Sequence, residues 1–169
     1  EHLPEAHERR RNDGDHDPSV AWDYTAELAQ RNKLSLALNL DDDAGRAILR
    51  DLVRTADVFV TDWPRARIEQ QGLDYTRLCA LKPDIIYARA SGFGPKGPDR
   101  DLPALDELAA ARTGMMPILP QPGQPPVYAG AGQMYTAVML AFGVSLALHH
   151  RQATGEGQEV DVSLFAGNI

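Results

Sequence analysis

The sequence predicts an α/β fold built on a doubly wound, mainly parallel sheet. From residue 34 onward, short apolar runs typical of strands alternate with segments of helical periodicity. The connections between them are short and contain Gly, Pro or Asp. Strands that alternate with helices through short connections form parallel sheets with right-handed crossovers.

The first predicted unit is a strand, a helix and a second strand. Leucines alternate with smaller residues over 34–40, which is the pattern of a strand with two different faces. Three aspartates at 41–43 then offer an N-cap and the negative charge that a first helical turn favours. Apolar residues recur at helical spacing over 44–55, and residues 58–60 form a short β-branched and aromatic run. We therefore expect a strand, a helix and a strand in this order.

Two short helices and a third strand follow. Residues 64–71 are predicted as a helix with Pro in its first turn and Gly72 as its stop. Asp74 caps a helix that runs through residue 81, and residues 85–87 form an apolar strand.

The second half begins with helices and returns to a strand. Residues 104–116 are predicted as a helix, followed by a Pro-rich connector over 117–126. Small residues at 129–132 precede a long apolar helix over 133–150, where free backbone N–H groups can face an anion. Residues 159–164 alternate as a last strand.

Three segments are placed by this topology beyond the carboxyl ends of predicted strands, where parallel sheets bind ligands. They are residues 39–43, 61–65 and 91–97. The last is Gly-rich but has neither Walker A nor dinucleotide-site spacing, so a plain turn and a ligand loop both remain open. Trp63 is interpreted either as a cap on the core or as a stacking surface for a purine base, with Arg65 near the phosphate.

Composition limits the function classes. The 169 residues suit one domain, and a formal net charge of −7 argues against nucleic-acid binding. Cys79 is the only cysteine, which excludes disulfides and thiolate metal clusters and fits a cytoplasmic protein. The longest apolar stretch, 137–148, is shorter than the roughly 20 residues that cross a bilayer, so we expect no membrane partner. Residues 1–30 are a polar terminal segment whose histidines lack metal-site spacing, and Asp106 is interpreted as a first-turn helix carboxylate.

Six motifs occur in an order and spacing that resemble the family III CoA-transferases, the group that includes formyl-CoA transferase and alpha-methylacyl-CoA racemase. The resemblance covers residues 31–169 and predicts an N-terminal-half fragment of a family-length protein. The motifs are Arg31-Asn-Lys33 before the first strand, Ala56-Asp-Val-Phe-Val-Thr61, Gly72-Leu-Asp-Tyr75, Ile86-Tyr-Ala-Arg-Ala-Ser-Gly-Phe-Gly94, Pro103-Ala-Leu-Asp106 and Thr154-Gly-Glu-Gly-Gln-Glu-Val-Asp-Val-Ser-Leu164.

The resemblance implies part of a Rossmann-like large domain, with a core over 34–98, a helical segment over 103–151 and a final strand over 159–164. It also implies an interlocked homodimer in the full-length protein, acyl-CoA and a carboxylic acid as substrates, and no metal. The CoA site that it implies consists of Asn32, Lys33, Leu38, Leu40, Asp62, Trp63, Arg65, Ser91, Gly92, Phe93 and Gly94.

The family's catalytic aspartate follows a glycine just before the long apolar helix, and here that pair is Gly132-Gln133. A carboxylate can attack a thioester to form an anhydride, whereas a neutral amide is a very poor nucleophile. Asp41 stands where the family commonly has Lys, and Pro64 stands where it has a basic residue. The racemase His-Asp pair maps to Leu105-Asp106, which disfavours racemisation.

Three hypotheses therefore stand beside one another. The first is a CoA-transferase whose chemistry centres on position 133. The second is a non-catalytic relative that binds acyl-CoA or pairs with an active subunit. The third is an inactive truncated product that exposes the buried surface of the full-length protein.

Overall fold

The computed structural model describes residues 28–169 of the chain. The chain divides into two compact units, Glu1–Ala37 and Leu38–Ile169. The second unit contains the sheet. Most of the predicted terminal segment over 1–30 lies outside the described residues.

The predicted strand over 34–40 is wrong. Residues 34–39 have no regular structure, and Leu34 and Leu36 are 100% and 61% exposed. A strand is stabilised by a hydrogen-bonded neighbour and by burial of one face. Within the described residues this segment has neither, so alternation alone did not produce a strand.

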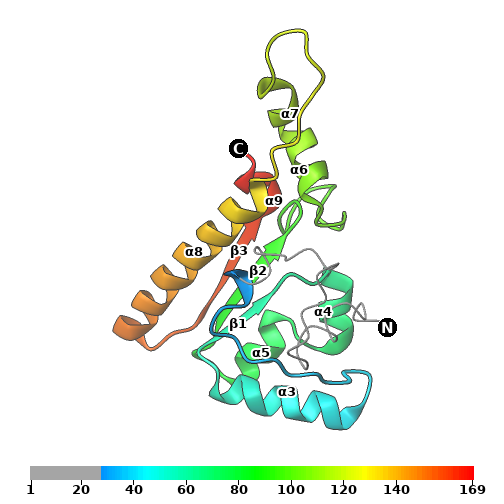
Figure 1. The fold of residues 1–169 in the computed structure, drawn as a ribbon. Helices are drawn as coiled ribbons and strands as arrows, with labels where there is room; N and C mark the ends of the chain where they lie inside the picture. Colours follow the sequence, from blue (N-terminus) through cyan, green and yellow to red (C-terminus); the bar gives the residue numbers. More distant parts are fainter. Residues whose placement is uncertain (1–27) are drawn as a thin grey trace, which may run out of the picture. The chain divides into compact units, whose positions relative to one another are not determined.

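The sheet contains three parallel strands in the order β1-β2-β3 (Figure 1). They are β1 Val58–Thr61, β2 Ile86–Ser91 and β3 Gln158–Ser163. These strands confirm the predictions over 58–60, 85–87 and 159–164, and β2 continues four residues beyond its predicted end at Tyr87, to Ser91. Their shared direction brings all three carboxyl ends to one edge of the sheet.

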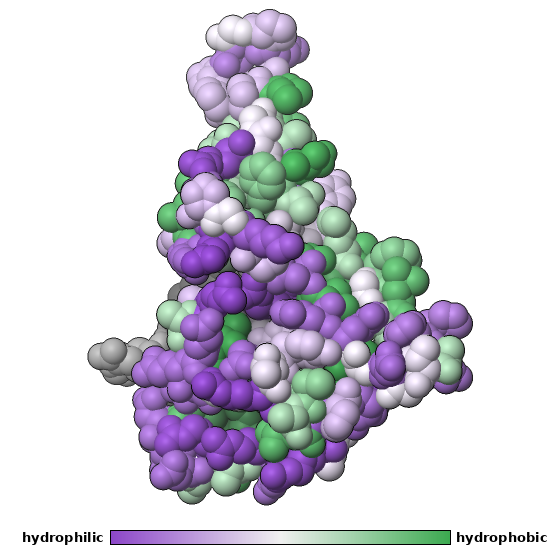
Figure 2. Space-filling model, turned by 180° about the vertical axis from the view of Figure 1, so that it is seen from behind, coloured by the Kyte–Doolittle hydropathy of each residue, from purple (hydrophilic) through white to green (hydrophobic). Residues whose placement is uncertain are grey.

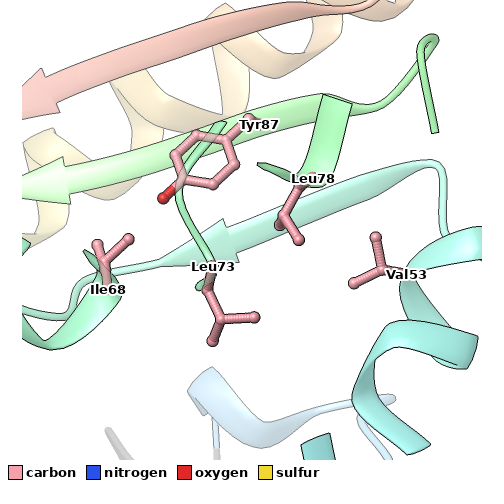
Figure 3. Packing of buried hydrophobic residues seen from close by; sticks show 5 residues of the cluster. All are labelled: Val53, Ile68, Leu73, Leu78 and Tyr87. Carbon is pink, nitrogen blue, oxygen red and sulfur yellow. The ribbon is translucent and has the colours of Figure 1, made fainter. Parts of the chain in front are cut away.

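One face of the sheet is covered by three helices, which are α3 Asp43–Thr55, α4 Arg65–Gln71 and α5 Tyr75–Leu81. As predicted, Asp74 caps α5 by accepting from the backbone of Arg77, and Gly72 ends α4 with a φ of 69°. Figure 3 shows the apolar cluster that joins these helices to Tyr87 of β2. Its buried members are Val53, Ile68, Leu73, Leu78 and Tyr87.

The second half contains α6 Asp106–Thr113, α7 Met115–Ile118, α8 Gly132–Thr154 and α9 Leu164–Gly167. The helix predicted over 104–116 is two helices, because Gly114 adopts a φ of 78° between them. The long apolar helix is confirmed as α8. The short helix α9 was not predicted, since four residues are too few to show helical periodicity.

The opposite face of the sheet is covered by α8, which packs on β2 and β3. Gly143 lets the helix approach closely, because a Cβ there would lie 2.7 Å from Val160 Cγ1 of β3. Helices on both faces of a parallel sheet confirm the predicted α/β class.

Candidate functional site

The loop after β2 is tied to the carboxyl end of β3. Ser91 Oγ accepts a hydrogen bond from the Gly94 backbone N–H at 3.0 Å and lies 3.3 Å from the Val162 carbonyl, to which it donates. The Gly92 carbonyl accepts from the Phe165 backbone N–H at 3.0 Å. Because these bonds join the loop to the start of α9, the Gly-rich segment has one defined path along the sheet edge.

Close packing explains two residue choices in this loop. A Cβ at Gly92 would lie 3.0 Å from the Pro103 carbonyl oxygen, so a larger residue would fit there only if the neighbouring backbone moved slightly. The Phe93 ring lies 6.2 Å from the Phe165 ring, centroid to centroid, and the Arg112 guanidinium lies 5.9 Å from the Phe93 centroid. An aromatic and cationic surface therefore forms beside the loop.

The amino end of α8 surrounds a buried carboxylate. Asp106 is 1% exposed and accepts three hydrogen bonds. The donors are the Asn168 amide at 2.7 Å, the Tyr128 hydroxyl at 2.8 Å and the Gln133 backbone N–H at 3.3 Å. A Cβ at Gly132 would overlap both Asp106 and Asn168, so the carboxylate reaches this helix end only because residue 132 is glycine.

These contacts assign different chemistry to Asp106 and Gln133. The prediction of Asp106 as a first-turn helix carboxylate is confirmed, but its side chain also holds the start of α8. Burial, followed by the hydrogen bond to Asp106, raises the pKa of Tyr128 to about 12, so this hydroxyl remains a donor at neutral pH. Gln133 is exposed and carries an uncharged amide.

Trp63 follows β1 and packs as a cap on the core, one of the two roles considered from the sequence. Its side chain packs against the core cluster, and the Arg67 guanidinium lies 3.9 Å from the indole centroid. Arg65 instead pairs with Glu69, with 2.9 Å between Nε and Oε1. That hydrogen bond is the main cause that raises the pKa of Arg65.

The remaining predicted site residues are less closely tied to this edge. Leu40 packs against the core cluster, and Leu38 is half-buried. Asp62 is exposed. Asn32 and Lys33 are also exposed but belong to the other compact unit. The structure thus groups Ser91 to Gly94 with the start of α9, while Trp63 stands at the end of β1.

Sequence reasoning missed Phe165, Asn168 and Arg67. Neither Phe165 nor Asn168 belongs to a recognisable site motif, and both acquire their neighbours only through α9. Within the described residues there is no group of three His, Cys, Asp or Glu side chains arranged to hold a metal. None of the helices over residues 28–169 combines the length and apolar character needed to span a membrane.

Comparison with known proteins places this architecture in a family. The family model for CoA-transferase family III matches residues 4–169. The chain belongs to this family. A cinnamoyl-CoA:phenyllactate CoA-transferase from Clostridium sporogenes is 38% identical over 144 residues, which cover 83% of this chain and 35% of the relative. An acetyl-CoA:oxalate CoA-transferase from Acetobacter aceti is 36% identical, with 84% and 37% covered.

Solved structures agree with this membership. A CAIB/BAIF family protein from Brucella suis matches with a TM-score of 0.76 and 29% identity, covering 79% of this chain and 36% of that protein. The family III chain therefore spans little more than a third of the length of the relatives it matches.

Proposed function

We propose that the full-length protein is a CoA-transferase whose site moves CoA from an acyl-CoA to a free carboxylic acid when position 133 carries a carboxylate. Family membership and the CoA-transferase names of the relatives support this activity. The observation that carries the proposal is the position of Gln133, which is exposed at the start of α8. This end of α8 packs against α9, and α9 is hydrogen-bonded to the Gly-rich loop. A reacting group at this position adjoins the sheet edge at which parallel α/β folds bind ligands.

The proposed CoA site lies along that edge. Phe93 and Trp63 offer aromatic surfaces, and the loop after β2 offers backbone groups close to them. The residues of the second unit that we assign to the site are Leu38, Leu40, Asp62, Trp63, Arg65, Ser91, Gly92, Phe93 and Gly94, while Asn32 and Lys33 remain a prediction of the family resemblance.

The proposed reaction requires a carboxylate at position 133. Its oxygen attacks the thioester carbon and expels the CoA thiolate, which leaves a mixed anhydride. The thiolate then attacks the enzyme's carbonyl, releases the donor acid and forms an enzyme thioester. The acceptor carboxylate attacks that thioester to form a second anhydride, and the returning thiolate takes the acceptor acyl group and restores the enzyme carboxylate.

Gln133 supplies no anionic oxygen for the first step, which favours a second candidate function. Asp41 and Pro64 also replace basic residues of the family pattern. Together these three positions favour a relative that binds acyl-CoA without turning it over. Asp106 does not replace the missing nucleophile, because it is buried and its carboxylate oxygens already accept three hydrogen bonds within the protein.

The test compares the native full-length protein with Gln133→Asp and Gln133→Asn. Each is assayed for CoA exchange between an acyl-CoA and a free acid, and for binding of CoA. We expect Gln133→Asp to transfer CoA, and Gln133→Asn to behave like the native protein, because only aspartate provides the attacking oxygen.

The outcomes separate the candidates. Normal CoA binding with no transfer by any of the three proteins would reject the transferase. Turnover by the native protein would reject the non-catalytic relative. Transfer by Gln133→Asp alone would place the family's chemistry at position 133 and explain its absence from the native chain.

We also propose that the full-length protein is an interlocked homodimer in the cytoplasm. Exposed apolar side chains along α8 support an assembly that covers them, and the free Cys79 is compatible with a reducing compartment. Light scattering of the full-length protein is expected to give twice the mass of one chain.

A further inference from the structure

The Arg67–Trp63 pair is the one stacked cation at the carboxyl end of β1 within the described residues. The guanidinium lies 3.9 Å from the indole centroid, while the indole also packs against the core cluster. Arg67 is exposed, and no carboxylate in the described part of the chain forms an ion pair with it. Its charge is therefore held beside an aromatic ring and is not neutralised there.

The neighbouring cation is in a different electrostatic setting. Arg65 donates to Glu69 at 2.9 Å, and the charges of Glu69, Asp101 and Glu159 all raise its pKa. These carboxylates compensate its charge and would repel an incoming phosphate. Pro64, at the position where the family resemblance expects a basic residue, has no charge at all. Of these three positions, only 67 presents an unneutralised cation.

We propose that Arg67 binds a phosphate group of CoA and leaves the Trp63 ring when it does so. This inference rests on the proposed CoA-binding function. A guanidinium–indole stack at an exposed site is weak, whereas a guanidinium can bind phosphate through two parallel hydrogen bonds. Exchange of the first contact for the second is favourable, and it uncovers a face of Trp63 beside the bound nucleotide.

The arrangement also accounts for the local sequence. Arg67 lies in the first turns of α4, directly after the segment that connects this helix to β1. A long side chain from that position reaches back over Trp63, as the observed stack shows. Arg67 thus provides, three residues later and at the same edge of the sheet, the positive charge that the chain lacks at position 64.

The experiment measures CoA affinity by calorimetry with the full-length protein. We expect Arg67→Gln to weaken CoA binding about tenfold, the loss of one charged hydrogen-bonded contact. Arg67→Lys keeps the charge without the planar fork and is expected to recover part of the affinity. Arg54→Gln, an exposed arginine of α3 paired with Asp51, is the matched control and should bind CoA normally.

Comparison with dephospho-CoA identifies the phosphate. If Arg67→Gln weakens binding of CoA but not of dephospho-CoA, Arg67 contacts the 3′-phosphate. If both ligands lose affinity equally, it contacts the diphosphate. Unchanged CoA affinity in Arg67→Gln, or a loss no larger than that of the control Arg54→Gln, would overturn the inference. Failure of the unsubstituted protein to bind CoA would instead overturn the proposed function, and is visible without any variant.

Discussion

At the residue scale, Asp106 couples three distant parts of the chain. Its oxygens accept from Tyr128, Gln133 and Asn168, and the last of these lies 62 residues away in sequence. A buried carboxylate is tolerated when hydrogen-bond donors replace its water. Here the donors come from the connector before α8, from α8 itself and from the residue that follows α9. Asp106 therefore holds the segment that presents residue 133.

Removing this carboxylate is expected to destabilise the fold. Asp106→Ala removes the acceptor of the Tyr128 hydroxyl and one of the two acceptors of the Asn168 amide, and we expect a loss of about 3 kcal/mol in the free energy of unfolding. Urea denaturation of the full-length protein measures it. Glu107→Ala is the control, because Glu107 is the exposed neighbour in the same helical turn. Equal effects of the two substitutions would show that the buried contacts contribute nothing.

For Asp106, the sequence predicted the position in a helix but not the side-chain contacts. Its place in the first turn of α6 was predicted, because it opens the helix that follows Pro103. Its three partners were not, because no local pattern relates residue 106 to residue 168. Likewise, Trp63 was recognised as an edge aromatic with two possible roles, but its contact with Arg67 required the turn geometry of α4.

At the element scale, α8 is anchored at both ends. Asp106 and Asn168 hold the amino end, as described above. Near the other end, Arg151 donates to the carbonyls of Asp57 and Asp84 at 3.3 and 3.2 Å and pairs with the Asp57 carboxylate at 2.8 Å. Asp57 directly precedes β1, and Asp84 lies two residues before β2. The Arg151 side chain therefore ties α8 to the amino ends of two strands.

We expect Arg151→Met to lower the free energy of unfolding of the full-length protein by about 2 kcal/mol. Methionine keeps much of the apolar stem but leaves two backbone carbonyls without this donor. Arg54→Met is the matched control, since Arg54 forms only an exposed pair within α3, and such pairs contribute about 0.5 kcal/mol or less. Thermal and urea unfolding should show a larger loss of stability for Arg151→Met than for Arg54→Met. The reverse order would contradict the role of Arg151 as an anchor of α8.

Element predictions succeeded where local signals agreed with burial. Asp74 and Gly72 define the ends of α5 and α4 through caps whose geometry depends on a few neighbouring residues. The strand predicted over 34–40 failed although its alternation was clear. Pairing with a neighbouring strand is a long-range requirement, and the described residues do not meet it for this segment.

At the scale of the whole molecule, α8 carries an exposed apolar stripe. Figure 2 shows hydrophobic side chains gathered along this helix. They recur at spacings of three and four residues along the helix, so they share one side of α8. Its larger members are Met134, Tyr135, Val138, Met139, Phe142 and Leu146, which are between 43% and 65% exposed. Exposed apolar surfaces of this kind are typical of protein interfaces, which agrees with the proposed homodimer.

Residues 1–169 expressed alone are expected to self-associate and to bind a hydrophobic dye, because the stripe is exposed among the described residues 28–169. Substituting Val138→Gln and Phe142→Gln together should reduce both effects. Leu102→Gln is the control, an exposed leucine outside α8. Sedimentation velocity and dye fluorescence measure the outcome, and a monodisperse, dye-silent native piece would contradict the expectation.

Four features were predicted from the sequence alone, which are the α/β class, three strands, the helix caps and the family motifs. Each depends on periodicity, capping or spacing within about a dozen positions, where neighbours along the chain are also neighbours in space. The buried Asp106 cluster, the Arg67–Trp63 stack and the stripe on α8 arise differently. They depend on which surfaces packing brings together or leaves uncovered, and that is decided by contacts between segments tens of residues apart.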